Sequence, residues 1–235
     1  MNSTWQGLVG NLAIVGLTIS IWAHLSHSVR NTWPEFERVA FGLTVGMGAI
    51  ASMILGIEIV PGVHMDLRGS LLLVAGLFGG PISASIAVAT AAIYRIGIGG
   101  AGVELGVFAI VVAALIGTIA HALLRHRAPT LKHVVVCAAV AAAIGATVFG
   151  MGARAGSVEP MRTVGLQVVV VNFLATLVCG LLLIRLRQAE MERTILRAAF
   201  SQAPEFFYVK DRDGRFVIAN ENGTTRSPTP PNLSV

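Results

Sequence analysis

Long apolar runs without formal charge, separated by short segments that contain arginine, extend along the chain from its start to residue 184. These runs are residues 1–29, 39–57, 69–94, 105–124, 133–153 and 163–184. A helix needs about 20 apolar residues to cross the roughly 30 Å hydrocarbon layer of a bilayer. Most of the runs reach that length, so the pattern predicts an all-α, polytopic membrane bundle of six to seven helices.

The run between Arg68 and Arg95 is interrupted at its middle by the triplet Gly79-Gly80-Pro81. One straight helix would hold the two arginines roughly 40 Å apart, beyond the apolar thickness of a bilayer. Paired glycines allow the chain to turn, and proline disfavours helix in the residue before it. We therefore weigh a single crossing, with six spans in all, against seven helical passes that include a hairpin of two short helices, about 70–78 and 82–95.

The distribution of basic residues favours the hairpin. If the segment after residue 184 is cytoplasmic, the hairpin places more arginines and lysines on the cytoplasmic side than the single crossing does, as the positive-inside rule expects. The arginines that remain outside are Arg68, Arg95, Arg154 and Arg162. Cations on the disfavoured side indicate a functional role, and an anionic ligand would explain them.

Composition agrees with a membrane domain and excludes several other classes. Hydrophobic residues make up 54% of the chain and charged residues 12%, whereas about a quarter of the residues of a soluble domain are charged. The net charge of +5 comes almost wholly from arginine, and every arginine before Arg185 lies at the edge of an apolar run, which is not a nucleic-acid-binding pattern. Cys137 and Cys179 lie deep in such runs, which excludes a disulfide scaffold or a thiolate metal cluster. His24 and His27 have no Asp, Glu or Cys near them in sequence, and His121, His126 and His133 fall at a basic end of a span, so we expect no metal and no cofactor.

Short motifs stand in a fixed order between residues 56 and 106. They are Pro61-Gly62, Asp66-x-Arg68, Gly76-x-x-Gly79-Gly80-Pro81, Tyr94-Arg95 and Gly99-Gly100. This series resembles the membrane domain of the five-transmembrane LYT-type receptors, over about residues 5–186. The resemblance implies the sensing part of a histidine kinase or a diguanylate cyclase, and several of the histidine kinases respond to pyruvate. The arrangement is also distantly similar to the substrate-binding S components of energy-coupling-factor (ECF) transporters.

The resemblance implies that Arg68 and Arg95 bind the ligand, since a guanidinium fork matches a carboxylate. The alternative is that both are interface residues whose aliphatic stems reach toward water. Asp66 is expected to orient or partly neutralise Arg68, or to cap the helix that follows. The weaker site candidates are Glu58, Arg154 and Arg162, and the predicted hinge is Gly79, Gly80 and Pro81.

Two further features of the spans bear on the ligand. The helix expected between Val103 and Gly117 contains no hydroxyl or thiol that could bind a carbonyl oxygen, which leaves room for a ligand other than pyruvate. Its N-terminus and that of the helix near Ser70 would point backbone N–H groups at the same region and attract an anion. Asn172, in the last span, is expected to form an interhelical hydrogen bond rather than a ligand contact.

The chain changes character after the last span. We expect a transmembrane sensor domain over 1–184, a helical signalling linker over 185–199, an incomplete PAS-like segment over 200–223 and a disordered tail over 224–235. A seam that two copies could share in a homodimer recurs at alternating spacings of four and three, at Ile184, Gln188, Met191, Ile195 and Ala198. The alternative for this linker is a solvated helix.

Residues 200–220 resemble the opening of a PAS domain. Apolar strands are expected around Phe207–Val209 and from Arg215 to Ala219, joined by an Asp-Arg-Asp-Gly turn in which glycine supplies the required positive φ. The resemblance stops at about Gly223, where a polar, proline-rich segment follows.

The pattern and the resemblance predict a multi-pass receptor of the bacterial inner membrane with a cytoplasmic C-terminus. Its partners would be the lipid bilayer, a second copy of the chain and a small extracellular, pyruvate-like carboxylate. The sequence carries no phosphate-binding loop, kinase ATP-site signature or GGDEF-like motif, so we expect a sensor input and not an enzyme. The alternative is a small-solute transporter or the substrate-binding component of one.

Overall fold

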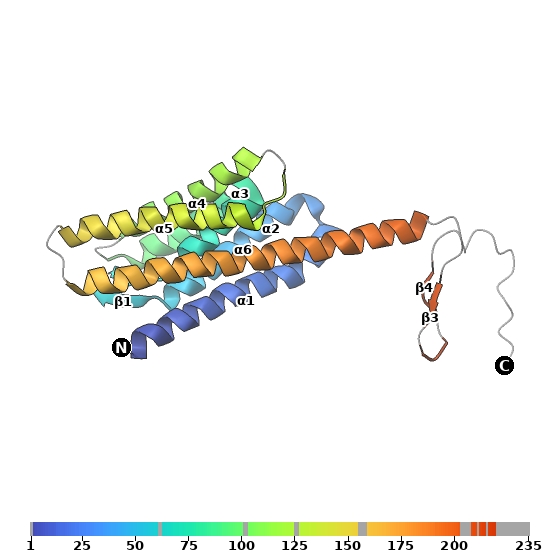
Figure 1. The fold of residues 1–235 in the computed structure, drawn as a ribbon, viewed down its shortest axis with the longest axis horizontal. Helices are drawn as coiled ribbons and strands as arrows, with labels where there is room; N and C mark the ends of the chain where they lie inside the picture. Colours follow the sequence, from blue (N-terminus) through green and yellow to red (C-terminus); the bar gives the residue numbers. More distant parts are fainter. Residues whose placement is uncertain are drawn as a thin grey trace. The chain divides into compact units, whose positions relative to one another are not determined.

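The computed structural model describes residues 2–60, 63–100, 103–124, 127–154, 159–202, 208–210, 212–214 and 216–219. The chain divides into two units, Met1–Ile184 and Arg185–Val235. Its helices (Figure 1) are α1 (Asn2–Thr32), the short 3-10 helix η1 (Pro34–Phe36), α2 (Glu37–Ile54), α3 (Arg68–Ile98), α4 (Val103–Leu124), α5 (Leu131–Arg154) and α6 (Glu159–Gln202). Its strands are β1 (Ile57–Val60), β2 (Val63–Met65), β3 (Tyr208–Lys210) and β4 (Phe216–Ala219).

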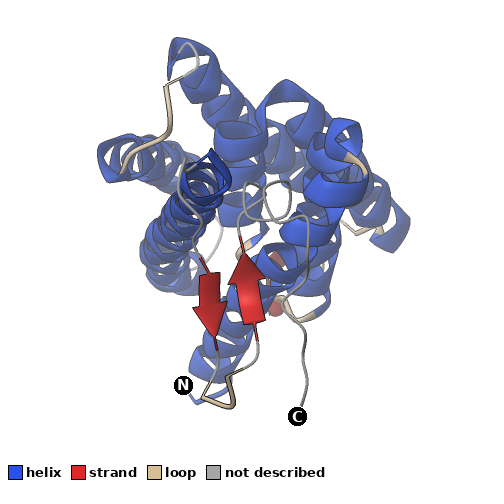
Figure 2. Cartoon of the chain, turned by 90° about the vertical axis from the view of Figure 1, so that its right-hand side faces the viewer, coloured by secondary structure: helices blue, strands red, loops and turns tan. Residues whose placement is uncertain are grey.

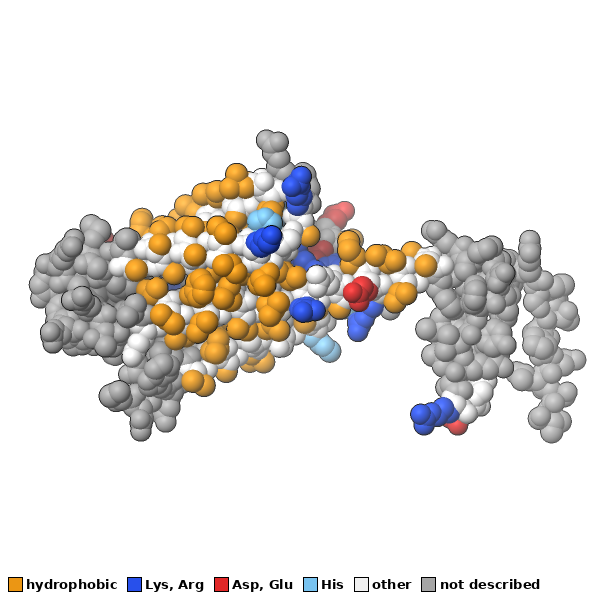
Figure 3. All heavy atoms as spheres, in the orientation of Figure 1, with side chains coloured by type: hydrophobic (Ala, Val, Ile, Leu, Met, Phe, Trp, Pro, Cys, Tyr) orange, Lys and Arg blue, Asp and Glu red, His pale blue; other side chains and the backbone are white. Residues whose placement is uncertain are grey.

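The helices form the predicted polytopic bundle. Among the described residues, five stretches are long and apolar enough to span a membrane, and they belong to α1, to η1 with α2, to α3, to α4 and to α6. In α5 the side chains are described only as far as Ala146, and the described apolar stretch, Leu131–Ala146, is shorter than these spans. Figure 2 shows the helices close to end-on, gathered side by side, and Figure 3 shows hydrophobic side chains covering the bundle on the face drawn. An apolar outer surface of this kind suits contact with lipid.

The centre of the bundle is the first part of α3. This helix consists of a first segment, residues 68–79, and a second segment, residues 81–98, separated at Gly80. Every residue from Ser70 to Gly80 is buried, because α3 packs extensively against both α2 and α4. An apolar helix that is covered on all sides explains why this stretch shows no polar face in the sequence.

The chain reverses at Gly80. Its backbone has φ 74° and ψ −165°, a conformation that is essentially open to glycine alone. Arg68, at the start of the first segment, and Arg95, near the end of the second, lie beside the same residue, Gly106. A straight helix would separate the two arginines by roughly 40 Å. The predicted hairpin is therefore confirmed, and the single crossing is wrong.

Side chains from neighbouring elements hold this turn in place. Pro81 begins the second segment, where the missing proline N–H costs no helical hydrogen bond. Ser83 Oγ donates a hydrogen bond of 2.7 Å to the backbone oxygen of Arg38 on α2. The Nδ1 atom of His121 on α4 lies 3.0 Å from the backbone oxygen of Leu77. The turn is thus attached to both helices that pack against α3.

The first segment of α3 and α4 approach each other closely because both carry a glycine at the crossing. A β-carbon on Gly117 would overlap the backbone oxygen of Leu73, and one on Gly76 would lie 2.6 Å from the backbone oxygen of Ala114. Small residues at such crossings let helix backbones pack at short range in membranes.

We predict that Gly117→Ala forces α3 and α4 apart and lowers the free energy of unfolding by about 1–3 kcal/mol, as overpacking of a tight core does. The matched control is Gly145→Ala on α5, where the nearest atom would be Val169 Cγ2 at an ordinary 3.5 Å. Thermal unfolding of the purified proteins in detergent measures both variants. Equal melting temperatures for the two would contradict the close crossing.

Two small β-hairpins accompany the helices. β1 pairs antiparallel with β2, with Glu58 opposite His64. No strands were predicted from the sequence in this segment. The β-branched residues of the two strands explain the extended backbone. In the second unit, β3 pairs antiparallel with β4, within the segment expected to begin a PAS domain. The PAS assignment and the functional division into domains stay predictions.

Candidate anion-binding site

Arg95 lies on the buried face of the second segment of α3. The buried residues of this segment recur at helical spacing, at Ser83 and Ala84, then at Ala87, Ala91 and Arg95. Since side chains three and four apart share one helix face, the same periodicity that buries the alanines turns the arginine into the bundle. Arg95 is only 2% exposed, so its guanidinium does not extend to the molecular surface.

Arg68 is held by Asp66, two residues before it. The Oδ1 atom of Asp66 accepts a hydrogen bond of 3.0 Å from the backbone N–H of Arg68, and Oδ2 accepts one of 3.1 Å from Nη1 of the same residue. The side chain of Asp66 is 2% exposed and that of Arg68 is 11% exposed. Asp66 therefore orients the guanidinium and also satisfies an N–H group at the start of α3, which lacks a partner within the helix.

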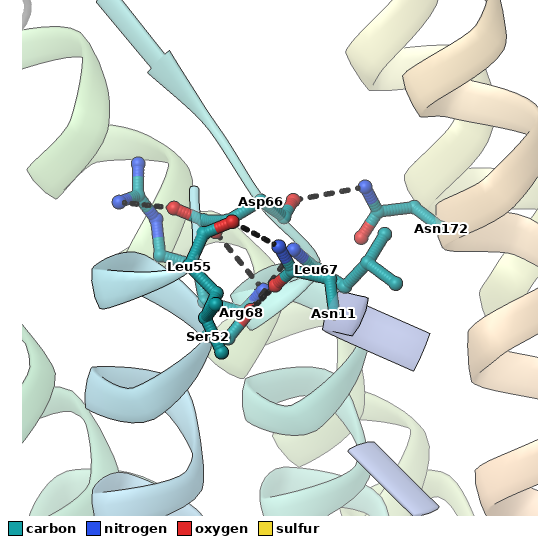
Figure 4. A network of polar contacts seen from close by, with 7 residues as sticks. All are labelled: Asn11, Ser52, Leu55, Asp66, Leu67, Arg68 and Asn172. Atoms are coloured by element: carbon teal, nitrogen blue, oxygen red, sulfur yellow. Dashed lines mark hydrogen bonds and ion pairs between the residues drawn. The ribbon is translucent and has the colours of Figure 1, made fainter. Parts of the chain in front are cut away.

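Asn172 attaches α6 to the same loop (Figure 4). Its Nδ2 atom donates to the backbone oxygen of Asp66 at 3.3 Å, and its Oδ1 atom accepts a hydrogen bond of 3.1 Å from Ser70 Oγ. Ser70 Oγ also donates to the backbone oxygen of Asn172 at 2.9 Å. The interhelical hydrogen bond predicted for Asn172 is confirmed.

A second polar group fixes the loop from the side of α1 and α2 (Figure 4). Asn11 donates to the backbone oxygen of Leu55 at 2.8 Å and accepts a hydrogen bond from Ser52. Ser52 Oγ in turn accepts a hydrogen bond of 3.1 Å from the backbone N–H of Leu67. Because Leu67 stands between Asp66 and Arg68, this network sets the position of both charged residues.

A cleft of about 250 Å³ opens beside the two arginines and is lined by residues of α3, α4, α5 and α6. Among the described residues that line it, the charged ones are Asp66, Arg68 and Arg95, and most of the others are apolar. α5 and α6 lie side by side along the cleft (Figure 1), with Gly145 next to Val169.

Gly106, in the first turns of α4, allows both guanidinium groups to approach the backbone of this helix. A β-carbon there would lie 2.7 Å from Nε of Arg95 and 3.2 Å from Nη2 of Arg68. Only a residue without a side chain leaves space for both arginines at this position. The start of α4 thus faces the arginines, and free N–H groups of a first helical turn favour anions.

The charges at this end of the cleft do not balance. Two guanidinium groups meet one carboxylate among the described lining residues, and buried charges are stable only when they are paired and hydrogen-bonded. The Nε atom of Arg95 is buried and has no hydrogen-bond partner in the described part of the chain. The arrangement can accept one further negative charge, most simply a carboxylate bound by the two guanidinium groups.

The weaker candidates stand elsewhere or lie outside the described side chains. Glu58 is in β1, Arg154 is the last residue of α5, and Arg162 is in the first turn of α6; the side chains of all three are outside the described part of the structure. Within the described residues, His, Cys, Asp and Glu form no group of three or more that could hold a metal ion.

Sequence reasoning did not identify Gly106 and Ser70 as parts of the site. The signal for Gly106 is a glycine in the first turns of an apolar helix, where helix propensity disfavours it. Ser70 follows Arg68 by two residues, and a hydroxyl in a mostly apolar helix segment usually has a hydrogen-bond partner. Neither signal specifies which residue lies opposite, so the contacts with the arginines and with Asn172 follow only from the folded chain.

One comparison with known proteins gives a match. The model of the family described as 5TMR of 5TMR-LYT matches residues 22–186, a range that contains α2 to α5, the charged end of the cleft and the part of α6 that lines it. No curated protein and no solved structure matches the chain.

Proposed function

Because the chain belongs to the 5TMR-LYT family of five-transmembrane receptors, we propose that it is a membrane sensor domain that binds a small extracellular carboxylate between Arg68 and Arg95. The observation that carries the proposal is Arg95, a buried guanidinium whose Nε atom has no partner among the described residues. A bound carboxylate would supply the missing acceptor and the missing negative charge.

The contacts of the cleft suggest how binding could be transmitted. Asn172 and Thr176 line the cleft, and both belong to α6, which continues without a break to Gln202. A carboxylate drawn toward Arg68 would act on Asp66 and, through its backbone oxygen, on Asn172. The change would pass along α6 into the predicted linker, residues 185–199, and from there to a cytoplasmic output of histidine-kinase or diguanylate-cyclase type.

The predicted homodimer seam belongs to this linker. Met191 and Ile195 are 67% and 60% exposed, as residues would be that become covered only in a dimer. Coupling between a ligand site and such an output is typically worth about 1–3 kcal/mol, so two arrangements of α6 that differ by only a few kcal/mol would suffice.

A ligand-stabilisation screen tests the proposal. We predict that pyruvate or another small mono- or dicarboxylate raises the melting temperature of the purified chain, because a ligand at 100 times its dissociation constant adds about 2.7 kcal/mol of stability. The shift should disappear in Arg68→Ala and in Arg95→Ala. A screen in which no carboxylate stabilises the wild type, or in which both variants still respond, would overturn the proposal.

A vesicle assay separates sensing from transport. A receptor that only binds its ligand accumulates none, so reconstituted vesicles should retain labelled pyruvate at the level of empty vesicles. Accumulation above that level would show the alternative, a solute transporter.

A further inference from the structure

The cleft is much larger than the carboxylate group that its charged end would hold. Its volume is about 250 Å³. Asp66, Arg68 and Arg95 occupy one end of it, and Ile116 lies on the same helix as Gly106, ten residues farther along. At 1.5 Å per residue the cleft therefore follows α4 for about 15 Å away from the arginines.

The wall beyond the arginines is apolar. α4 contributes Phe108, Val112 and Ile116, α5 contributes Ala142, and α6 contributes Phe173. A ligand that carried polar groups along its whole length would lose their hydration against this wall without gaining hydrogen bonds, which is unfavourable.

The polar groups that line the cleft near the arginines already have hydrogen-bond partners. Ser70 Oγ donates to Asn172, and Thr176 Oγ1 donates to the backbone oxygen of Asn172 at 2.8 Å. Asn172 Nδ2 donates to the backbone oxygens of Asp66 and Val168. A keto or hydroxyl oxygen on the part of the ligand beyond the arginines would have to displace one of these bonds, whereas an aliphatic tail would displace none.

From this division we infer that the ligand is an aliphatic monocarboxylate of medium chain length, with its carboxylate on Arg68 and Arg95 and its tail along α4 toward Ile116. The inference rests on the proposed function, because it assigns the ligand class of the same site. Such a ligand differs from pyruvate because its binding requires the apolar part of the cleft, where each buried methylene contributes to affinity.

Binding of a homologous series by the full chain in lipid nanodiscs tests the inference. Calorimetric titration with acetate, butanoate, hexanoate and octanoate should show dissociation constants that fall about fourfold per added methylene until the cleft is filled. Pyruvate should bind no more tightly than butanoate. A parallel titration with palmitate delivered in the nanodisc lipid distinguishes the source. Weaker binding of palmitate than of octanoate would support a medium-chain ligand, whereas tighter binding would contradict the chain length and indicate an occupant supplied by the bilayer.

A variant that fills the apolar part of the cleft tests the inference, and a neighbouring variant serves as its matched control. Ala142→Leu should weaken octanoate binding at least tenfold and leave acetate within about twofold, whereas Ala143→Leu should change neither, since Ala143 is exposed and is absent from the described lining. If Ala142→Leu does not fold, Val112→Phe fills the same space from α4.

Two negative outcomes are distinct. Acetate and pyruvate that bind as tightly as octanoate, with binding that still depends on Arg95, would overturn the tail site and keep the receptor proposal. Absence of binding by every member of the series, and by the dicarboxylates of the stabilisation screen, would overturn the receptor proposal itself.

Discussion

Gly80→Ala is expected to be among the most damaging single methyl additions in the bundle. Its φ of 74° and ψ of −165° cost a non-glycine residue about 1–3 kcal/mol. A β-carbon would also lie 2.9 Å from Nε2 of His121, and overpacking of this kind adds about 1–3 kcal/mol. We expect the melting temperature of the purified protein to fall by several degrees, measured by thermal unfolding in detergent.

The same helix offers the control for this prediction. Gly97 has no atom within 4 Å of the position that its β-carbon would take and does not have a positive φ. Replacing an interior helical glycine by alanine normally stabilises a helix by up to about 1 kcal/mol, so Gly97→Ala should melt at or above the wild-type temperature. If Gly80→Ala behaves like Gly97→Ala, the chain does not reverse in the way described.

Arg95→Met is expected to have the largest effect on ligand binding while keeping the bundle folded. Methionine fills most of the space of the arginine stem. It removes the guanidinium, whose Nε atom has no hydrogen-bond partner in the described part of the chain. A hydrogen bond to a charged group contributes about 1.5–3 kcal/mol, which corresponds to a loss of affinity of roughly 10-fold to 150-fold. Calorimetric titration with the carboxylate that stabilises the wild type most strongly measures this loss.

Arg38→Met is the matched control, because Arg38 is exposed and its backbone contacts the turn at Gly80, the opposite end of the hairpin from Arg95. Its affinity for the carboxylate should equal that of the wild type. Equal losses in both variants would indicate an effect of net charge on the protein and not a site at Arg95.

The hairpin could be predicted from the sequence because its cause is local. Two glycines followed by proline dictate a break whatever surrounds them, and the distance between Arg68 and Arg95 along a straight helix is too great for one crossing. Once the chain reverses, the proximity of the two arginines follows without knowledge of any other helix. The contact between Asp66 and Arg68 could be predicted for the same reason, because the two residues are only two positions apart in the sequence.

The remainder of the site depends on which helices become neighbours, which no local pattern specifies. Gly106 matters because α4 passes directly over both arginines, and Asn172 matters because α6 reaches the loop before α3. The β1–β2 hairpin was not predicted, since its strands are too short to show an alternating pattern. The apolar extension of the cleft exists because α5 and α6 leave space next to α4, a property of packing.

The contact between a bound carboxylate and the arginines can be measured directly by solid-state NMR. The protein would carry ¹⁵N in its arginine side chains, and the ligand ¹³C in its carboxylate. Hydrogen bonds of about 2.7–2.9 Å between guanidinium nitrogen and carboxylate oxygen would give strong ¹³C–¹⁵N dipolar dephasing in the wild type and in Arg38→Met. The dephasing should be lost in the double variant Arg68→Met/Arg95→Met under conditions where the ligand is still present. Bound ligand without dephasing in the wild type, or dephasing that survives in the double variant, would contradict an anion site built from these two arginines.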